Sequence, residues 1–197
     1  AAVACRGETV LHNCPELSDV GVSVPILRRL ACRCVRRGKT LAVCADGMSR
    51  CDIPHSLMRE MRSSIVFLGA ILARAGVASL SFPGGCELGP RPIDLHLLAL
   101  EKLGVEIREE HGCLLCRAPK GIQGGFISLA FPSVGATENL LLAAATGHGT
   151  TVIANAAREP EIVDLAQYLN QCGARIYGAG ESCVIVEGVS ALSGSEC

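Results

Sequence analysis

A single cysteine, Cys86, lies in a glycine-rich segment where its thiol could do chemistry. Glycines at 84, 85 and 89 surround it, and the segment joins a strand pattern ending at Phe82 to a helix pattern beginning near Pro92. Such glycines permit tight bends or movement as a lid. A following cation, Arg91, and the free N–H groups of the first helical turn would favour the thiolate. We therefore expect a reactive thiol on a movable loop, with an incidental cysteine on a surface hairpin as the alternative.

The composition limits the classes of function. Twelve cysteines are scattered without regular spacing, several inside apolar runs, which is typical of reduced thiols in a cytoplasmic protein. A net charge of -1, with no Trp, two Tyr and four Phe, gives no footprint for nucleic acid. No apolar run reaches the roughly 20 residues that cross a bilayer, and no secretion signal is recognisable. We expect a protein with neither nucleic-acid nor membrane partners.

Two further clusters favour structural interpretations. Cys113 and Cys116 are three apart on a probable strand, where they would point to opposite faces, so we expect no zinc site there. Five arginines fall on a predicted helix and its exit, and a solvated face explains them best. These arginines are Arg28, Arg29, Arg33, Arg36 and Arg37.

The chain contains an internal repeat. Three segments share one plan of strand, loop, amphipathic helix, short strand, turn and return strand, and they span residues 9–43, 78–115 and 151–186. A spacing of about seventy residues is longer than that of solenoid repeats. Three copies are therefore expected to close around an axis.

Two helices of another kind lie between the repeats, at residues 56–75 and 135–147. The stretch 139–145 is apolar on nearly every side, which predicts a buried helix and central helices with sheets outside. A third such helix would be expected just before Glu8, where only residues 1–5 remain. The sequence thus looks like a piece of a longer protein.

Four motifs resemble a known family, the UDP-N-acetylglucosamine 1-carboxyvinyltransferases (enolpyruvyl transferases) of bacterial peptidoglycan synthesis. The motifs are residues 61–65, residues 83–86 with 89–96, residues 133–137 and residues 155–164. The resemblance covers the whole chain and implies an α/β fold, an inside-out α/β barrel of three repeated β-α-β-β type units with central buried helices. Residues 1–197 would form a single domain, the N-terminal half of a two-domain enzyme, with the active site between the two barrels.

The resemblance also implies a reaction and a catalytic residue. Transfer of the enolpyruvyl group from phosphoenolpyruvate to the sugar 3-hydroxyl requires a proton delivered to a methylene carbon and later removed from it as phosphate leaves. Cys86 would be the proton donor and the target of the epoxide fosfomycin. Arg62 matches an arginine of the substrate site, although a surface salt bridge is the ordinary interpretation of such a residue.

The nucleotide would be held by two helix starts. Arg91, Pro92, Ile93, Asp94 and Leu95 match the segment that holds uridine, with Arg91 as the cap and Pro92 as the first helical residue. The diphosphate would bind at the start of the buried helix, at Ser133, Val134 and Gly135. Ordinary helix initiation and capping are the alternatives. His96 could help to order the site, or it could be structural.

The chain also departs from the family. Some members carry a lysine where this chain has Phe131 and a tryptophan where it has Val66, which puts the strength of nucleotide binding in doubt. The family's Lys-Asn pair, catalytic aspartate and phosphate-binding arginines have no counterpart here. We therefore expect the isolated chain to be inactive without its C-terminal barrel domain, because half a site cannot close over both substrates. No cofactor and no metal are expected.

Two alternative functions remain open at this stage. The chain could be a binding module that retains affinity for the nucleotide sugar without catalysis, which a phosphate-release assay would distinguish. It could instead resemble the shikimate-pathway enolpyruvyl transferase, which uses no uridine ligand. The Gly84-Gly85-Cys86 sequence argues against that relative, and a purely structural protein gains nothing from an oxidisable thiol.

Overall fold

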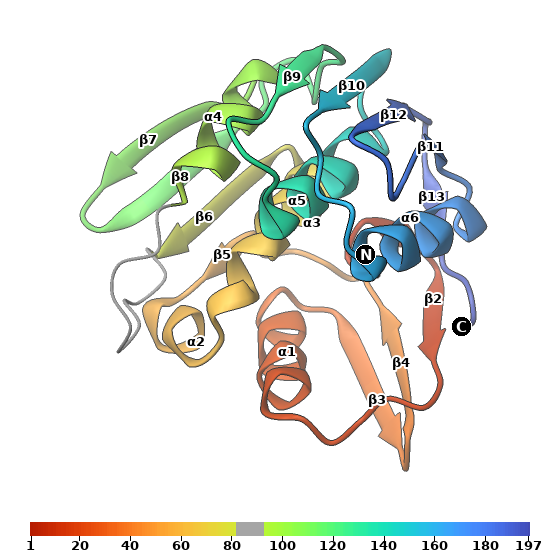
Figure 1. Cartoon of the computed structure of the whole chain (residues 1–197). Helices are drawn as coiled ribbons and strands as arrows, with labels where there is room; N and C mark the ends of the chain where they lie inside the picture. The colour runs from red at the N-terminus through yellow and green to blue at the C-terminus, as the bar shows by residue number, and fades with distance from the viewer. Residues whose placement is uncertain (82–92) are drawn as a thin grey trace.

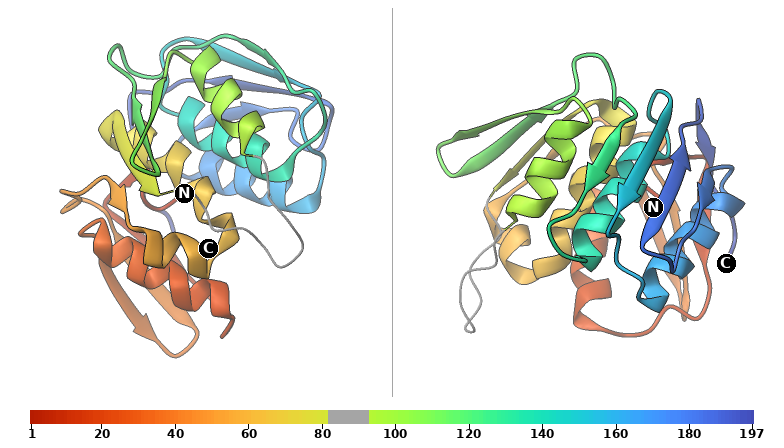
Figure 2. Two further views of the ribbon diagram at one scale, coloured as in Figure 1. Left: turned by 90° about the vertical axis from the view of Figure 1, so that its left-hand side faces the viewer. Right: turned by 45° about the horizontal axis from the view of Figure 1, so that its top comes forward.

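In the described part of the chain, three sheets of three or four strands surround two buried helices (Figure 1). The computed structural model describes residues 1–81 and 93–197, apart from the side chain of Arg62. Each sheet belongs to one of the three repeats expected from the sequence, and Figure 2 shows the same arrangement from two further directions.

The second and third sheets have the same strand order. The second runs β5 (Asp52–Ile53), β6 (Val77–Ser81), β8 (Cys113–Arg117) and β7 (Glu106–Glu110). The third runs β9 (Phe126–Ser128), β10 (Thr150–Ala154), β12 (Cys183–Glu187) and β11 (Arg175–Tyr177). In both sheets the first two strands pair in parallel and the other pairs are antiparallel. One folding plan therefore occurs twice.

The first sheet repeats this plan by using the far end of the chain. It contains β2 (Glu8–Leu11), β4 (Thr40–Cys44) and β3 (Arg33–Arg37) in antiparallel pairs. Beside it, β1 (Cys5–Arg6) pairs in parallel with β13 (Leu192–Ser193). The amide of Val10 donates to the carbonyl of Ser195 at 3.0 Å and the amide of Cys197 donates to Val10 at 2.9 Å. Residues 192–197 thus supply the parallel neighbour that β5 and β9 supply in the other sheets.

One surface helix belongs to each sheet, and these helices come after β2, β6 and β10 in the chain. These helices are α1 (Ser18–Arg29), α4 (Asp94–Lys102) and α6 (Pro160–Gln171). In α6, Pro160 stands in the first turn, where its missing N–H costs nothing, and Ile162, Ala166 and Leu169 are buried at helical spacing. The predicted order of strand, helix and two further strands is therefore present in all three repeats.

The predicted helix over residues 56–75 is interrupted. The chain forms α2 (His55–Glu60), then a 3-10 helix η1 (Arg62–Val66), then α3 (Phe67–Ala75). At Met61 the backbone is extended, with φ -136° and ψ 116°, and the side chain is buried. The hydroxyl of Ser64 donates to the carbonyl of Met58 across this break. Burial of Met61 decides the break, and no local glycine or proline signalled it.

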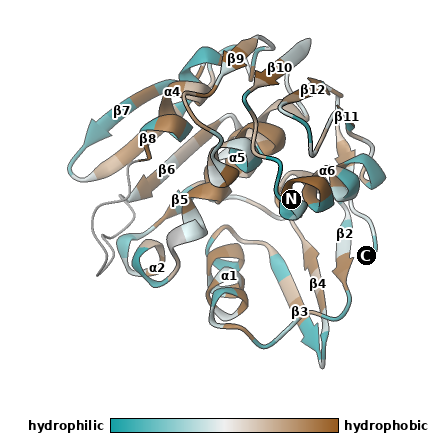
Figure 3. Cartoon of the chain, viewed as in Figure 1, coloured by the Kyte–Doolittle hydropathy of each residue, from teal (hydrophilic) through white to brown (hydrophobic). Residues whose placement is uncertain are grey.

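The buried helix α5 (Val134–Ala144) begins and ends close to its prediction. Leu140, Leu141 and Ala143 have no exposed surface, and hydrophobic residues extend along the helix in Figure 3. Burial of each leucine contributes about 1.5–3 kcal/mol to folding. The helix packs along α3 in the middle of the molecule (Figure 1). The apolar stretch therefore forms the centre of the core, as the sequence predicts.

One polar side chain, Asn139, joins the central helices. Its Oδ1 accepts the amide N–H of Gly69 on α3 at 2.7 Å, and its Nδ2 donates to the carbonyl of Ile65 on η1 at 3.0 Å. The same Nδ2 lies 2.8 Å from Nδ1 of His96 on α4. These bonds satisfy a fully buried amide that would otherwise cost about 1–3 kcal/mol.

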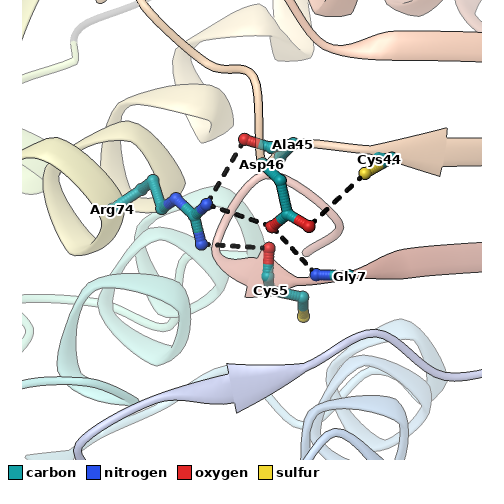
Figure 4. A network of polar contacts seen from close by, with 6 residues as sticks. All are labelled: Cys5, Gly7, Cys44, Ala45, Asp46 and Arg74. Carbon is teal, nitrogen blue, oxygen red and sulfur yellow. Dashed lines mark hydrogen bonds and ion pairs between the residues drawn. The ribbon is translucent and has the colours of Figure 1, made fainter.

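A second polar network fixes α3 to the first sheet (Figure 4). The guanidinium of Arg74, at the end of α3, donates to the carbonyls of Cys5 and Ala45 and to the carboxylate of Asp46. Asp46 accepts the amide N–H of Gly7 at 3.0 Å, and this bond is the main cause of its lowered pKa. The network joins β1 and the end of β4 to a central helix.

The arginine cluster differs in part from its prediction. Arg28 and Arg29 belong to α1, but Arg33, Arg36 and Arg37 lie on β3 rather than at a helix exit. This strand is at the sheet edge, where charged side chains protect exposed backbone groups from pairing with other chains. Their exposure agrees with a solvated surface.

We predict that Gly69→Ala strongly destabilises the chain. A Cβ at this position would lie 2.3 Å from the backbone oxygen of Asn139 and 2.8 Å from its Oδ1. The helices must separate to accept it, at a cost of about 3 kcal/mol in a urea unfolding experiment. Gly21→Ala in α1 is the control, because its Cβ would meet nothing within 4 Å. Equal stability of both variants would contradict this packing.

We also predict that His96 makes stability depend on pH. Burial lowers the pKa of His96 from 6.5 to about 4, so the folded chain binds fewer protons than the unfolded chain between these values. The free energy of unfolding should fall, by on the order of 3 kcal/mol, as the pH drops from 6.5 to 4. Urea titrations should show that His96→Gln lacks this contribution. The exposed His55 gives the control variant His55→Gln, which should retain it.

Candidate functional site

Several predicted site residues lie outside the part of the chain that the structure describes. Cys86, Arg91 and Pro92 fall between residues 82 and 92. Arg62 begins η1 directly after the break at Met61, and its side chain is likewise outside the description. The described candidates are those at the starts of α4 and α5.

The start of α4 differs from the sequence prediction. The helix begins at Asp94 with Ile93 as its cap residue, two positions after Pro92. The amide of His96 donates to the carbonyl of Ile93 at 2.9 Å, which closes a tight first turn. Ile93 is buried, so packing of this side chain sets the start of the helix. Asp94 is exposed and Leu95 half-buried, and the Asp94 carboxylate complements the helix dipole.

The start of α5 combines a cap with free backbone donors. Ser133 has an extended backbone, and its Oγ accepts the amide N–H of Ala136 at 3.4 Å. Helix geometry leaves the amide N–H groups of Val134 and Gly135 without intrahelical acceptors. Ser133, Val134 and Gly135 are all half-buried. This end can therefore accept an anion while Ser133 caps the helix.

The first turns of α4 and α5 meet at His96 and Gly135. A Cβ built on Gly135 would lie 3.0 Å from Cε1 and 3.4 Å from Nε2 of His96. A side chain at position 135 would be a tight fit, and the imidazole would have to move back by a few tenths of an ångström to accept it. The described parts of the two predicted nucleotide segments are thus adjacent, although they are far apart in the sequence.

The fourth motif, residues 155–164, supports the start of α5. The hydroxyl of Thr137 donates to the carbonyl of Ser133 at 2.8 Å and accepts the amide N–H of Ala157 at 3.1 Å. Asn155 adopts a left-handed conformation with φ 57°, and its Nδ2 donates to the carbonyl of Leu129. The loop before α6 therefore helps to fix the segment that leads into α5.

A hollow of about 460 Å³ is lined by none of the described residues at these two helix starts. It is mostly apolar and is lined by residues 1–3 and by side chains of α1, α3, α5 and α6, including Leu27, Phe67, Leu142 and Tyr168. Residues 2–4 form a turn where the other two repeats have α3 and α5. This hollow does not contain the candidate nucleotide residues.

The two departures from the resembled family lie in different surroundings. Phe131 is 57% exposed, two residues before the cap of α5, so an apolar ring stands at the approach to the helix start. Val66 is half-buried at the hollow beside α3. Any direct effect on an anion at α5 is therefore expected from Phe131.

Sequence reasoning missed the partner of His96. Asn139 was assigned only to an apolar helical stretch, and His96 was considered alone. One signal was available in the sequence, a single amide side chain inside a run of leucines and alanines. Such a side chain must have hydrogen-bond partners when it is buried. The pairing itself depends on how α4 packs against α5 and could not be predicted locally.

Other kinds of site find no support in the described part of the chain. The described residues contain no group of three or more His, Cys, Asp or Glu side chains placed to hold a metal ion. Their cysteines are all free thiols. Among their helices none combines the length and apolar character needed to cross a membrane.

Comparison with known sequences gives a consistent result. The chain is 49% identical over 196 residues to UDP-N-acetylglucosamine 1-carboxyvinyltransferase 2 of Caldanaerobacter subterraneus subsp. tengcongensis, covering 100% of this chain and 47% of that protein. It is 49% identical over 201 residues to UDP-N-acetylglucosamine 1-carboxyvinyltransferase 1 of Symbiobacterium thermophilum, covering 100% and 46%. The chain thus spans about half the length of these relatives.

Solved structures show the same fold. The enolpyruvyl transferase NikO from Streptomyces tendae superposes with a TM-score of 0.84 at 24% identity, covering 100% of this chain and 47% of that one. EPSP synthase from Acinetobacter baumannii gives a TM-score of 0.74 at 18% identity, covering 99% and 44%. The sequence profile of the EPSP synthase (3-phosphoshikimate 1-carboxyvinyltransferase) family matches residues 1–197. The chain therefore belongs to this family of enolpyruvyl transferases.

Proposed function

We propose that the chain is part of a UDP-N-acetylglucosamine 1-carboxyvinyltransferase, which transfers the enolpyruvyl group of phosphoenolpyruvate to the 3-hydroxyl of UDP-N-acetylglucosamine. The observation that carries the proposal is the contact between the first turns of α4 and α5, where two matching motifs meet through His96 and Gly135. The names of the relatives at 49% identity support the same substrate.

The nucleotide sugar is proposed to bind along these two helix starts. Arg91, Pro92, Ile93, Asp94 and Leu95 would hold the uridine end. Ser133, Val134 and Gly135 would receive the diphosphate, since backbone N–H groups and the positive end of a helix dipole favour an anion. The exposed Asp94 carboxylate suits the N–H edge of a pyrimidine, because an ionised carboxylate only accepts hydrogen bonds.

Cys86 is proposed as the general acid of the reaction. Its thiol would protonate the methylene carbon of phosphoenolpyruvate while the sugar 3-hydroxyl bonds to the adjacent carbon and passes its proton to a base, which the family's catalytic aspartate in the second barrel would supply. Removal of a proton from the resulting methyl group and departure of phosphate would then restore the double bond in the product. Arg62 is proposed to contact substrate in the same cleft, where its charge would stabilise anionic groups.

A second barrel is proposed to complete the enzyme. In this proposal residues 1–197 form an inside-out α/β barrel, which is the N-terminal half of the enzyme. Coverage of 47% and 46% of the relatives is consistent with a missing domain. The active site would form between the halves, so the isolated chain would bind the nucleotide weakly and not turn over. We further propose a cytoplasmic role in peptidoglycan synthesis, and hence in cell division and cell shape, with fosfomycin as an inhibitor.

The nucleotide assignment predicts selective binding that depends on Gly135. Calorimetric titration should detect binding of UDP-N-acetylglucosamine and none of shikimate 3-phosphate. Gly135→Ala should weaken the binding at least tenfold, because its Cβ would press on His96 and displace the first turn of α5. Gly47→Ala is the matched control, since its Cβ would lie at ordinary contact distance, 3.5 Å from the carbonyl of Ala31.

Two outcomes of this titration would contradict the assignment. Preference for shikimate 3-phosphate would favour the EPSP synthase activity that names the family. Retention of nucleotide binding in the absence of phosphate release, with the second half supplied in trans, would favour a binding module without catalysis.

The catalytic assignment predicts selective modification of one thiol. After incubation with fosfomycin, intact-mass and peptide mass spectrometry should find one adduct at Cys86, increased by UDP-N-acetylglucosamine. Opening of the epoxide by a thiolate adds the whole inhibitor, so the mass increase equals that of one molecule. Cys86→Ser should show no adduct. The half-buried Cys113 gives the control variant Cys113→Ser, and equal labelling of many cysteines would exclude a special role for Cys86.

A further inference from the structure

His96 occupies the junction between the two candidate nucleotide segments. It lies in the first turn of α4, only 8% of its surface is exposed, and its ring packs against the first turn of α5. Its Nδ1 is 2.8 Å from Nδ2 of Asn139, while Nε2 lies on the side that faces Gly135. One ring nitrogen is thus bonded in the core, and the other lies beside the first turn of α5.

Backbone groups fix the orientation of the Asn139 amide. The N–H of Gly69 can only donate, so the atom 2.7 Å from it must be the amide oxygen of Asn139. The carbonyl of Ile65 can only accept, so the atom 3.0 Å from it must be the amide nitrogen. Neither contact survives an exchange of the two atoms. The side chain therefore has a single orientation.

This orientation determines the tautomer of His96. Nδ2 of Asn139 carries two hydrogens, of which one is donated to Ile65 and the other is directed to Nδ1 of His96. Nδ1 must accept, so the proton of the neutral imidazole resides on Nε2. A protonated ring would bring two N–H donors together. Burial acts in the same direction and lowers the pKa of His96 to about 4, so the ring is neutral near pH 7.

We propose that His96 is a binding residue whose Nε2–H, fixed by Asn139, donates to a phosphate oxygen of the nucleotide beside the amides of Val134 and Gly135. This inference rests on the proposed function, because it takes the diphosphate as the anion at α5. A neutral donor held without freedom to rotate adds a directed hydrogen bond and loses little entropy on binding. Because the imidazole stays neutral near pH 7, it adds no positive charge to the site.

The tautomer can be measured without any ligand. Long-range nitrogen-15 correlation spectra of the histidine-labelled chain at pH 7 should show a protonated Nε2 and an unprotonated Nδ1 for His96. The assignment comes from the signal that disappears in His96→Gln. A proton on Nδ1, or on both nitrogens, would overturn the proposal. Asn139→Asp should place a proton on Nδ1, because a carboxylate can only accept from it.

Binding experiments then test the role of the donor. Titrations should compare UDP-N-acetylglucosamine, UDP and uridine in the wild-type chain, in His96→Phe and in His96→Gln. We expect His96→Phe to lose about tenfold or more in affinity for UDP and UDP-N-acetylglucosamine, since a bond to a charged group is removed. Uridine, which lacks phosphate, should bind all three equally. His96→Gln, whose amide can still donate, should recover part of the loss.

The outcomes separate this proposal from the proposed function. Equal UDP affinity in the wild-type chain and His96→Phe would overturn the role of His96 alone. A parallel loss for uridine and UDP would show a structural effect and would likewise overturn it. Absence of UDP binding by the folded wild-type chain would overturn the nucleotide assignment itself. Circular dichroism shows whether each variant folds. The tautomer itself is measured on the wild-type chain.

Discussion

The buried amide of Asn139 is the interaction on which the central arrangement of the molecule depends. It lies in a helix that is otherwise apolar, and its three partners belong to α3, η1 and α4. Apolar packing between α3 and α5 supplies attraction but little direction. Hydrogen bonds to two backbone groups specify one rotation and one height of α5, because any other position leaves an amide without partners in the core. The helix starts are thereby fixed to one another.

The sheets depend on a different constraint, the need of each parallel strand for a neighbour. β6 and β10 receive theirs from the segment just before the adjoining central helix, whereas β1 and β2 pair with residues 192–197. Contacts between residues 5–10 and 192–197 thus close the first sheet against the end of the chain. Arg74 reinforces this closure, since it joins α3 to the carbonyls of Cys5 and Ala45. Asn139 thus joins the central helices to one another, and Arg74 joins one of them to the first sheet.

Much of the fold could be predicted from the sequence, because hydrophobic period and turn residues recur in all three repeats. The third repeat, predicted over residues 151–186, agrees to within one residue at each end with the span from β10 to β12. The break at Met61 and the strand at Arg33 were not, since burial and sheet pairing override local preference there. For the site, the predicted start of α5 is correct to within one residue, whereas α4 begins two residues later than predicted. Their contact through His96 is a property of tertiary packing, while Cys86 stays a prediction.

The close approach of Gly69 to Asn139 has a consequence for how related sequences can vary. A side chain at position 69 is excluded by the backbone oxygen of residue 139 as well as by its amide, so glycine is required whatever residue stands at 139. Position 139 can vary more, provided that the new side chain accepts the Gly69 amide N–H and bonds to the His96 ring. In related sequences, positions 96 and 139 should therefore change together, while position 69 stays glycine.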